Sequence, residues 1–271
     1  MTTIGVVGYG VVGKAVAQGF HEKGYQVFIN DVKTRRLMHI TKVFSSKHQL
    51  LKICDFIFIC VGTPPDSHGR MNDGYLIHTL NEFSDIDEAN PCEELPIFVI
   101  KSTMLPGTTT ALEEAYPRFR FAVNPEFLRA KTADYDFLNP DRIIVGASLD
   151  EVAMEVLHLY DSWSCARCVT SPIAAELIKH LSNAYLLTKI AFACEMQRLC
   201  QHYYIDDMDT VYKGVTSDHR INKSHLNPLL GRIPFDSPCL PKDLLALLKA
   251  LEDDGVDTSY LQGVFDGGVQ L

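Results

Sequence analysis

The stretch that decides the fold is Ile4-Gly5-Val6-Val7-Gly8-Tyr9-Gly10-Val11-Val12-Gly13, near the start of the chain. An apolar run that is typical of a strand meets three glycines spaced as G-x-G-x-x-G, and a helical pattern follows at once. Gly8 permits a tight turn, Gly10 lets a ligand approach the backbone, and Gly13 lets the helix and the strand pack closely. This context predicts a dinucleotide-binding βαβ unit, with the pyrophosphate on the helix N-terminus.

Asp31 ends the next apolar run of the chain. A carboxylate at this spacing can accept hydrogen bonds from the hydroxyls of the adenine ribose, which favours NAD over NADP. Lys33, Arg35 and Arg36 follow closely and could receive a 2′-phosphate, but we expect the negative charge of Asp31 to outweigh them. The sequence therefore predicts NAD as the cofactor. A glycine-rich turn in some other α/β protein is the alternative.

Short apolar runs continue outward from this unit along the first half of the chain. Helical patterns lie between several of them, and the runs are too apolar for strands with one solvent-facing side. We therefore expect an α/β fold with a Rossmann-type doubly wound parallel sheet, covered by helices on both sides. The predicted strands are Ile4–Val7, Val27–Ile29, Phe56–Val61, Ile97–Ile100, Phe119–Val123 and Ile143–Val145.

The second half of the chain has a different pattern. One long helical stretch covers 174–201 without glycine or proline, and no strand pattern follows it. We expect 255–271 to be the end of a connecting helix plus a glycine-rich tail. The sequence therefore predicts an NAD-binding Rossmann domain over 1–171 and a smaller all-helical domain over 172–271. Because the long helix is apolar on more than one face, we also expect a homodimer built on it.

The composition excludes several classes of partner. The chain has 25 lysines and arginines against 34 aspartates and glutamates, so its net charge is −9 and no basic stripe is left for nucleic acid. No window holds the roughly 18 apolar residues of a membrane-spanning helix. No apolar signal core precedes the first strand, and we expect a cytoplasmic protein. The eight cysteines are typical of reduced, mostly buried thiols, and Cys165 and Cys168 lack the second pair of a zinc site, so no metal is predicted.

Five further segments carry the chemistry of the chain. They are Cys60-Val61-Gly62-Thr63-Pro64, Lys101-Ser102-Thr103, Asn124-Pro125-Glu126-Phe127-Leu128-Arg129, Glu176-Leu177-Ile178-Lys179 with Asn183, and Cys239-Leu240-Pro241-Lys242-Asp243. In order and spacing the chain resembles the UDP-glucose/GDP-mannose dehydrogenase family over almost its whole length. The resemblance implies a nucleotide-sugar substrate whose C6 hydroxyl is oxidised twice, through an aldehyde, to a carboxylate, with reduction of two NAD. The implied cofactor-binding residues are Gly8, Gly10, Val11, Val12, Gly13, Asp31, Val61, Gly62, Thr63, Pro64 and Thr103.

Cys239 matches the nucleophile of that family. An aldehyde becomes a hydride donor only after a nucleophile has added to it, so the second oxidation needs a thiol. Pro241 is expected to be the first residue of a helix through 244–251, and a helix N-terminus lowers the pKa of a nearby thiol. Lys242 would add positive charge. A buried, inert cysteine in front of a helix is the alternative.

The resemblance also assigns the remaining catalytic residues. Lys179 and Asn183 lie four residues apart on one helix face and form the implied oxyanion site, worth about 3 kcal/mol per donor. Asp243 and Thr103 would position the water that hydrolyses the thioester, and Glu126 would assist. The alternatives are a solvated lysine, a packed asparagine and a carboxylate that caps its own helix. The implied substrate-binding residues are Phe127, Leu128, Arg129, Lys179, Asn183 and Arg220.

Three departures from the family pattern leave the function open. The chain stops before the family's second Rossmann-like domain, residues 231–238 replace a glycine-rich loop, and Ala130 stands in place of a second glutamate. Three hypotheses follow: an active minimal sugar dehydrogenase with a partner chain that supplies the missing domain, a non-catalytic NAD-binding homologue or partner subunit, and a single-step β-hydroxyacid-type dehydrogenase. Cys239 argues against the last, because one oxidation needs no thiol.

Overall fold

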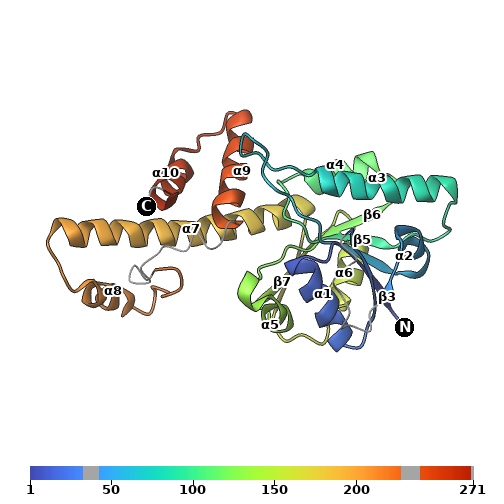
Figure 1. Cartoon of the computed structure of the whole chain (residues 1–271), viewed down its shortest axis with the longest axis horizontal. Helices are drawn as coiled ribbons and strands as arrows, with labels where there is room; N and C mark the ends of the chain where they lie inside the picture. Colours follow the sequence, from blue (N-terminus) through green and yellow to red (C-terminus); the bar gives the residue numbers. More distant parts are fainter. Residues whose placement is uncertain (33–42, 227–238, 270–271) are drawn as a thin grey trace. The chain divides into compact units, whose positions relative to one another are not determined.

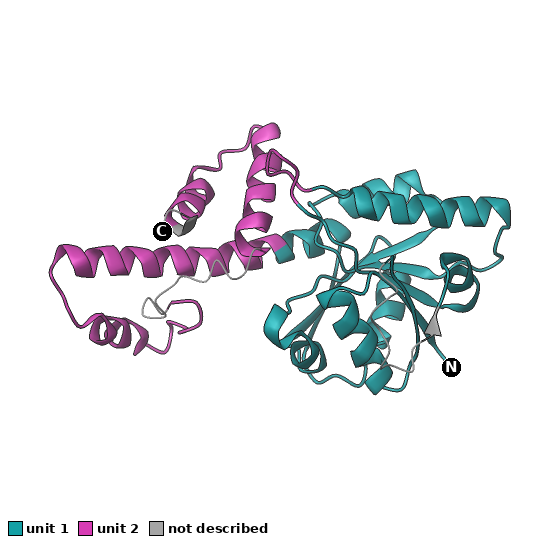
Figure 2. Ribbon diagram, viewed as in Figure 1, with its two compact units in different colours: residues 1–64, 72–179 teal, residues 65–71, 180–271 magenta. Residues whose placement is uncertain are grey.

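The computed structural model describes residues 1–32, 43–226 and 239–269, and the chain divides into two compact units. Unit 1 comprises residues 1–64 and 72–179, and unit 2 comprises residues 65–71 and 180–271 (Figure 2). The division falls inside the long helix, so this helix contributes residues to both units. The predicted domain boundary after Ser171 stays a prediction.

Unit 1 contains a sheet of eight described strands in the order β3-β2-β1-β4-β5-β6-β7-β8 (Figure 1). Neighbouring strands are parallel except β6 and β7, which are antiparallel and share the single pair Val123 and Gly146. The predicted doubly wound sheet is confirmed. The prediction that all of its strands are parallel is wrong at one place, because β6 and β7 are antiparallel. The strands are β1 (Thr3–Val7), β2 (Gln26–Asn30), β3 (Val43–Phe44), β4 (Phe56–Ile59), β5 (Ile97–Ile100), β6 (Arg120–Val123), β7 (Arg142–Gly146) and β8 (Ala166–Thr170).

All six predicted strands are present, and two strands were not predicted. β3 has only two residues, which is too short for a sequence pattern. β8 is an edge strand whose side chains are mostly exposed, so it lacks the apolar run that marks the inner strands. Cys165 precedes this strand and Cys168 lies in it. Since a strand rises about 3.3 Å per residue, the extended spacing between the two cysteines is too long for a disulfide between them.

Helices cover both faces of the sheet in unit 1. Alternate strand residues point to opposite faces: Phe58 packs with α1, α5 and α6, whereas Ile57 and Ile59 pack with α2, α3 and α4. These two clusters form the core of unit 1. The helices are α1 (Val11–Glu22), α2 (Lys47–Ile53), α3 (Gly74–Ala89), α4 (Thr108–Ala115), the 3-10 turn η2 (Ala130–Thr132), α5 (Ala133–Leu138), α6 (Asp150–His158) and the first turns of α7 (Pro172–His202).

Unit 2 is helical, as predicted. It contains most of α7, followed by α8 (Met208–Thr216), α9 (Cys239–Asp253) and α10 (Ser259–Val269). One face of α7 packs against α9 and α10 in a cluster that includes Leu187, Cys194, Leu244, Leu248 and Val264. Within the described ranges no helix is long and apolar enough to cross a membrane.

Two details of unit 2 differ from the sequence prediction. The expected glycine-rich tail forms α10, because Leu261, Val264 and Phe265 lie on one side of it and pack against the cluster of α7 and α9. The described part of α9 begins at Cys239, so two helical residues precede Pro241 and it is not the first residue of the helix. A proline is still compatible with this place, since the first turn of a helix makes no intrahelical N–H bonds.

Candidate active site

The glycine-rich turn between β1 and α1 leaves room beside its backbone. Gly8 has φ +87°, a left-handed conformation that favours glycine, and a Cβ on Gly13 would lie 1.8 Å from the carbonyl oxygen of Gly8. The fold itself therefore requires glycine at both positions. A Cβ on Gly10 would meet no described atom within 4 Å. Gly10 therefore leaves open space at the N-terminus of α1. This is the place where a dinucleotide pyrophosphate binds.

Asp31, directly after β2, is hydrogen-bonded to the glycine turn. Asp31 accepts a hydrogen bond from the backbone N–H of Tyr9 at 2.6 Å, so its carboxylate holds the glycine turn. Val11 is 53% exposed at the start of α1, and Val12 packs on the core. A cavity of about 410 Å³ adjoins Val11 and is lined by Lys14 and residues 130–135. The residues present fit a dinucleotide; Lys33, Arg35 and Arg36 lie outside the described residues.

The loops after β4 and β5 are tied together by short hydrogen bonds. The Thr63 hydroxyl donates to the carbonyl of Thr103 at 2.9 Å, and the Ser102 hydroxyl donates to the carbonyl of Val61 at 2.6 Å. Gly62 is exposed, and Pro64 follows Thr63 at the surface. The structure therefore brings together the predicted residues Thr63 and Thr103 at the carboxyl edge of the sheet, where open α/β folds bind ligands.

Lys179 and Glu126 form a buried ion pair in unit 1. The ammonium of Lys179 donates to the backbone carbonyl of Glu126 at 2.7 Å and to its carboxylate Oε1 at 2.8 Å. The other carboxylate oxygen accepts the backbone N–H of Leu128 at 2.6 Å. An ammonium has three N–H donors, so among the described contacts one donor of Lys179 remains for a substrate oxygen.

The neighbours of this pair include the other predicted substrate residues. The ring centroid of Phe127 lies 3.8 Å from the Arg142 guanidinium and 5.6 Å from the Lys179 ammonium. The Leu128 side chain packs on the core. The Arg129 guanidinium is mostly exposed and pairs with Asp136 at 2.6 Å, which holds the pKa of that carboxyl at about 2. Ala130 begins η2 and lines the 410 Å³ cavity.

A buried lysine, Lys101, was not predicted to take part in the site. Its ammonium donates to the side-chain oxygen of Asn124 at 3.0 Å, and burial lowers its pKa to about 8. The Tyr160 hydroxyl donates to the same oxygen at 2.6 Å. One feature of the sequence indicates this burial. Lys101 continues the alternation of Ile97 and Val99, whose side chains point to the sheet face that is covered by α1, α5 and α6.

Glu176 belongs to the Glu176-Leu177-Ile178-Lys179 motif, from which the sequence predicts no role for it. It is buried on α7 and accepts the backbone N–H groups of Gly107 and Thr109 at 2.6 and 2.8 Å, and the Thr109 hydroxyl at 2.6 Å. It thus caps the N-terminus of α4 from another helix, which satisfies donors that a helix leaves unpaired. Burial nevertheless raises the pKa of Glu176. No local sequence pattern indicates a cap of this kind.

In unit 2, Asp243 is buried and held from several sides. Its carboxylate accepts the side-chain N–H of Asn183 at 2.7 Å, and the Lys242 ammonium lies 2.7 Å from its other oxygen. A ring nitrogen of His180 lies 3.2 Å from the backbone carbonyl of Asp243. Two of the predicted catalytic residues, Asn183 and Asp243, are therefore in direct contact.

Cys239 is exposed at the first described residue of α9, whereas Cys54, at the end of α2, is buried and Cys60, after β4, is partly buried. Burial raises the pKa of the Cys54 and Cys60 thiols to about 12, so these two are poor nucleophiles. The predicted loop 231–238 lies outside the described residues. Arg220 is exposed and bound to Asp218 at 2.5 Å.

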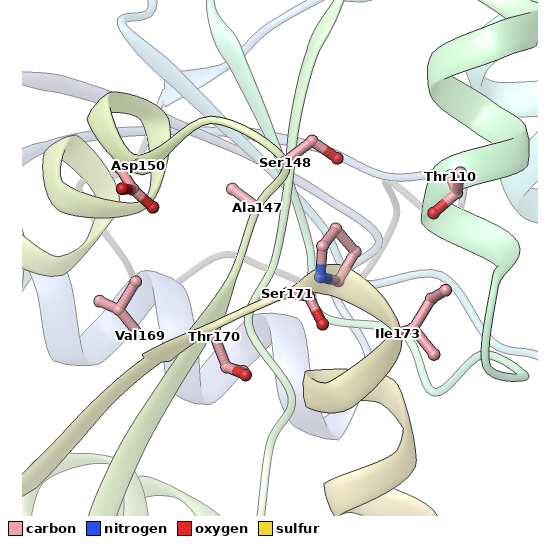
Figure 3. A pocket seen from close by; sticks show the side chains of 9 residues that line it. Thr110, Ala147, Ser148, Asp150, Val169, Thr170, Ser171 and Ile173 are labelled. Atoms are coloured by element: carbon pink, nitrogen blue, oxygen red, sulfur yellow. The ribbon is translucent and has the colours of Figure 1, made fainter.

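A further hollow of about 520 Å³ in unit 1 contains none of the predicted site residues (Figure 3). Its lining includes the hydroxyl side chains of Ser148, Thr170 and Ser171 at the starts of α6 and α7. The Ser148 hydroxyl donates to Glu113 at 2.6 Å, and Asp150 also lines the hollow. These carboxylates disfavour an anionic ligand there.

Two models of one family match most of the chain. Residues 41–164 match the NAD binding domain of the UDP-glucose/GDP-mannose dehydrogenase family, and residues 173–266 match its central domain. Residues 3–69 also match the family described as NADP oxidoreductase coenzyme F420-dependent. This second match covers the whole β1–α1–β2 region, which agrees with the predicted dinucleotide site, whereas the NAD binding domain match begins after β2.

Individual relatives give the same result. A UDP-glucose 6-dehydrogenase of Rickettsia bellii is 33% identical over 248 residues, which cover 89% of this chain and 55% of that protein. The structure of a UDP-glucose dehydrogenase from Pyrobaculum islandicum has a TM-score of 0.88 at 30% identity, over 99% of this chain and 68% of that one. The chain therefore spans about half the length of the curated relatives it matches.

The fold is also shared with a shorter enzyme. A 3-hydroxyisobutyrate dehydrogenase of Mycobacterium tuberculosis has a TM-score of 0.77 at 15% identity, over all of this chain and 93% of that one. At this identity the likeness shows the fold alone.

Proposed function

Because the chain belongs to the UDP-glucose/GDP-mannose dehydrogenase family, we propose that it is an NAD-dependent dehydrogenase that oxidises the primary alcohol of a sugar or nucleotide sugar to a carboxylate. One observation carries the proposal. α7 bears Lys179 and Asn183 one turn apart, and each is held by a carboxylate: Lys179 by Glu126 and Asn183 by Asp243. Fixed donors of this kind stabilise negative charge that develops on a substrate oxygen.

The first oxidation is assigned to donors on α7. The remaining N–H of Lys179, together with Asn183, would bind the substrate oxygen as it becomes an alkoxide and releases its hydroxyl proton to water. Glu126 keeps the ammonium in place, so it is a positioning residue in this scheme. NAD, when bound at the glycine turn, accepts the hydride that leaves the alcohol carbon.

The second oxidation is assigned to Cys239. Its thiolate would add to the aldehyde carbon, and the carbonyl oxygen would become the alkoxide of a thiohemiacetal. Loss of a second hydride leaves a thioester on Cys239, and water releases the carboxylate and restores the thiol. Asp243, with Thr103, would position that water, and Asp243 would accept its proton. The exposure of Cys239 supports this assignment, since a nucleophile must be reachable.

A homodimer and a cytoplasmic location belong to the same proposal. On α7 the large apolar side chains of Leu181, Tyr185, Phe192 and Leu199 are 48 to 67% exposed. Their spacing of four and seven residues places them along one face of the helix. Such a row supports an interface with a second copy of the chain. A partner chain that supplies a nucleotide-binding domain also stays a proposal, because the relatives are longer.

The test is a screen of NADH formation with product analysis. Purified chain would be offered nucleotide sugars, sugar phosphates and β-hydroxyacids together with NAD. Two NADH per carboxylate product support the proposed reaction. One NADH per product favours the single-step reaction of a β-hydroxyacid dehydrogenase, whose fold is shared. Binding of NAD without turnover on any substrate favours the non-catalytic homologue.

A further inference from the structure

Lys101 places a positive charge in the apolar core of unit 1. It follows β5 directly, and its side chain is on the face that Ile97 and Val99 share with the cluster of α1, α5 and α6. Only 5% of the residue is exposed, and its ammonium is 5.9 Å from the ring centroid of Phe137 on α5. A buried charge is costly unless it is compensated, so a lysine at this place needs a reason.

The contacts of Lys101 lead to the loop that carries Glu126. Its ammonium donates to Asn124, the residue after β6, at 3.0 Å. Asn124 in turn receives the Tyr160 hydroxyl at 2.6 Å and donates to the carbonyl of Ile144 at 2.6 Å. All of these contacts are inside unit 1. They fix the point at which the chain leaves β6 and turns toward Glu126, two residues later.

The charged and titratable groups that act on Lys101 come from four segments of unit 1. They are Cys60 after β4, Glu126 after β6, Tyr160 after α6 and Lys179 on α7. Glu126 attracts the ammonium, Lys179 repels it, and the Cys60 thiol is neutral at ordinary pH because burial raises its pKa to about 12. With both lysines protonated and Glu126 ionised, the buried cluster of Lys101, Glu126 and Lys179 has a net charge of about +1.

We propose that Lys101 is a positioning residue for the Lys179–Glu126 pair: it fixes the loop of Glu126 through Asn124 and supplies the second positive charge of the cluster. The inference rests on the proposed function in one respect, that the pair binds a substrate oxygen. When Lys101 is charged, the cluster favours negative charge on that oxygen. When Lys101 is neutral, the net charge of the cluster falls to about zero and this preference is lost. Desolvation lowers the pKa of Lys101 to about 8. Lys101 therefore loses its charge within the pH range in which an enzyme assay can be run.

The test measures the titration of Lys101 by NMR, on the full chain labelled with ¹³C at the lysine Cε. The Lys101 signal is identified by its loss in Lys101→Met; Lys101→Arg serves if the methionine variant does not fold. Glu126→Gln removes an attractive charge and should lower the titration midpoint by about one pH unit. Lys179→Met removes a repulsive charge and should raise the midpoint by about the same amount. Lys52→Met, on the exposed side of α2, is the matched control and should leave the midpoint unchanged.

Opposite shifts in Glu126→Gln and Lys179→Met support the inference. The inference is overturned if the titration midpoint of Lys101 is unchanged in both variants or shifts equally in Lys52→Met. The Lys101 charge would then be uncoupled from the Lys179–Glu126 pair. The titration does not depend on turnover. A chain that is inactive on every substrate but shows the opposite shifts would refute the proposed function and leave the coupling of Lys101 to the pair intact.

Discussion

Unit 1 and unit 2 each contain a lysine–carboxylate pair, and the two pairs are built in opposite ways. In unit 1, Lys179 and Glu126 are 53 residues apart in sequence and both mostly buried, with side chains 7% and 15% exposed. In unit 2, Lys242 and Asp243 are adjacent; Asp243 is 2% exposed, but Lys242 is 21% exposed and Asp243 also receives Asn183. A buried charge is costly when its partner is removed. The lysine is therefore expected to be essential to the first pair and replaceable in the second.

The largest difference is expected between Lys179→Met and Lys242→Met. The first leaves Glu126 buried without its cation and should lower the free energy of unfolding by about 3 kcal/mol. It should also lower turnover about 100-fold, because a donor to the alkoxide is lost. Lys242→Met should cost about 1 kcal/mol, since the lysine is partly solvated and Asn183 still binds Asp243. Urea unfolding and initial rates measure both. Equal losses in the two variants would contradict the comparison.

The pH dependence of stability tests the second cation of unit 1. The pKa of Lys101 is about 8 in the folded chain against an ordinary 10.5, so the unfolded chain binds more protons between these values. As pH rises from about 8 to 10.5, the titration of Lys101 should therefore raise the free energy of unfolding, by about 3 kcal/mol at most. Lys101→Met should lose this gain. The measurement is urea unfolding from pH 7 to 10.5, with the wild-type curve minus the variant curve as the result. A flat difference would count against a buried, charged Lys101.

A smaller effect is expected for Asn183→Leu in unit 2. It removes one of the two side-chain partners of the buried Asp243 carboxylate and should cost about 2 kcal/mol, the range of a hydrogen bond to a charged group. Thr188→Val on the same helix removes only a bond to the carbonyl of Ala184 and is the control, at about 0.5 kcal/mol. Both are measured by urea unfolding. If Asn183→Leu lowers the free energy of unfolding no more than the control does, Lys242 alone holds Asp243. The lysine of the second pair would then not be replaceable.

The smallest effect on folding is expected at the cofactor turn of unit 1. Gly10→Ala adds a methyl group that meets no described atom within 4 Å, so it should leave stability nearly unchanged but weaken NAD binding at least about tenfold. Gly13→Ala, with its 1.8 Å contact, should destabilise the fold instead. Calorimetric titration with NAD and NADP measures the effect and the preference. Equal or tighter binding of NADP by the wild type would refute the role assigned to Asp31.

The inner part of the fold could be predicted because it depends on local patterns. The β-branched apolar runs predicted all six strands that are buried on both faces, and an uninterrupted helical pattern predicted α7. The elements that were missed depend on contacts between distant residues. β8 is exposed at the sheet edge, and α10 contains three glycines yet is helical because Val264 packs into a core made by α7 and α9.

The site could be predicted as a set of residues but not as a set of contacts. The motifs indicated Lys179 and Glu126, while their pairing depends on a loop and a helix that meet in space. Lys101 belongs to the Lys101-Ser102-Thr103 motif, but its role depends on its burial, which follows from the alternation along β5, and on its contact with Asn124 after β6. The cap that Glu176 provides for α4 is long-range in the same way.

In the proposed reaction Lys179 is needed for both oxidations, whereas Cys239 is needed for the second alone. The most direct measurement is the number of NADH formed per substrate consumed, with a substrate found by the screen, in the wild type and in Cys239→Ser. A serine hydroxyl is far less acidic than a thiol and would add poorly to the aldehyde. We expect two NADH in the wild type and about one in Cys239→Ser, with the product remaining at the aldehyde level. Two NADH in Cys239→Ser would show that Cys239 is not the nucleophile and would contradict the proposed reaction.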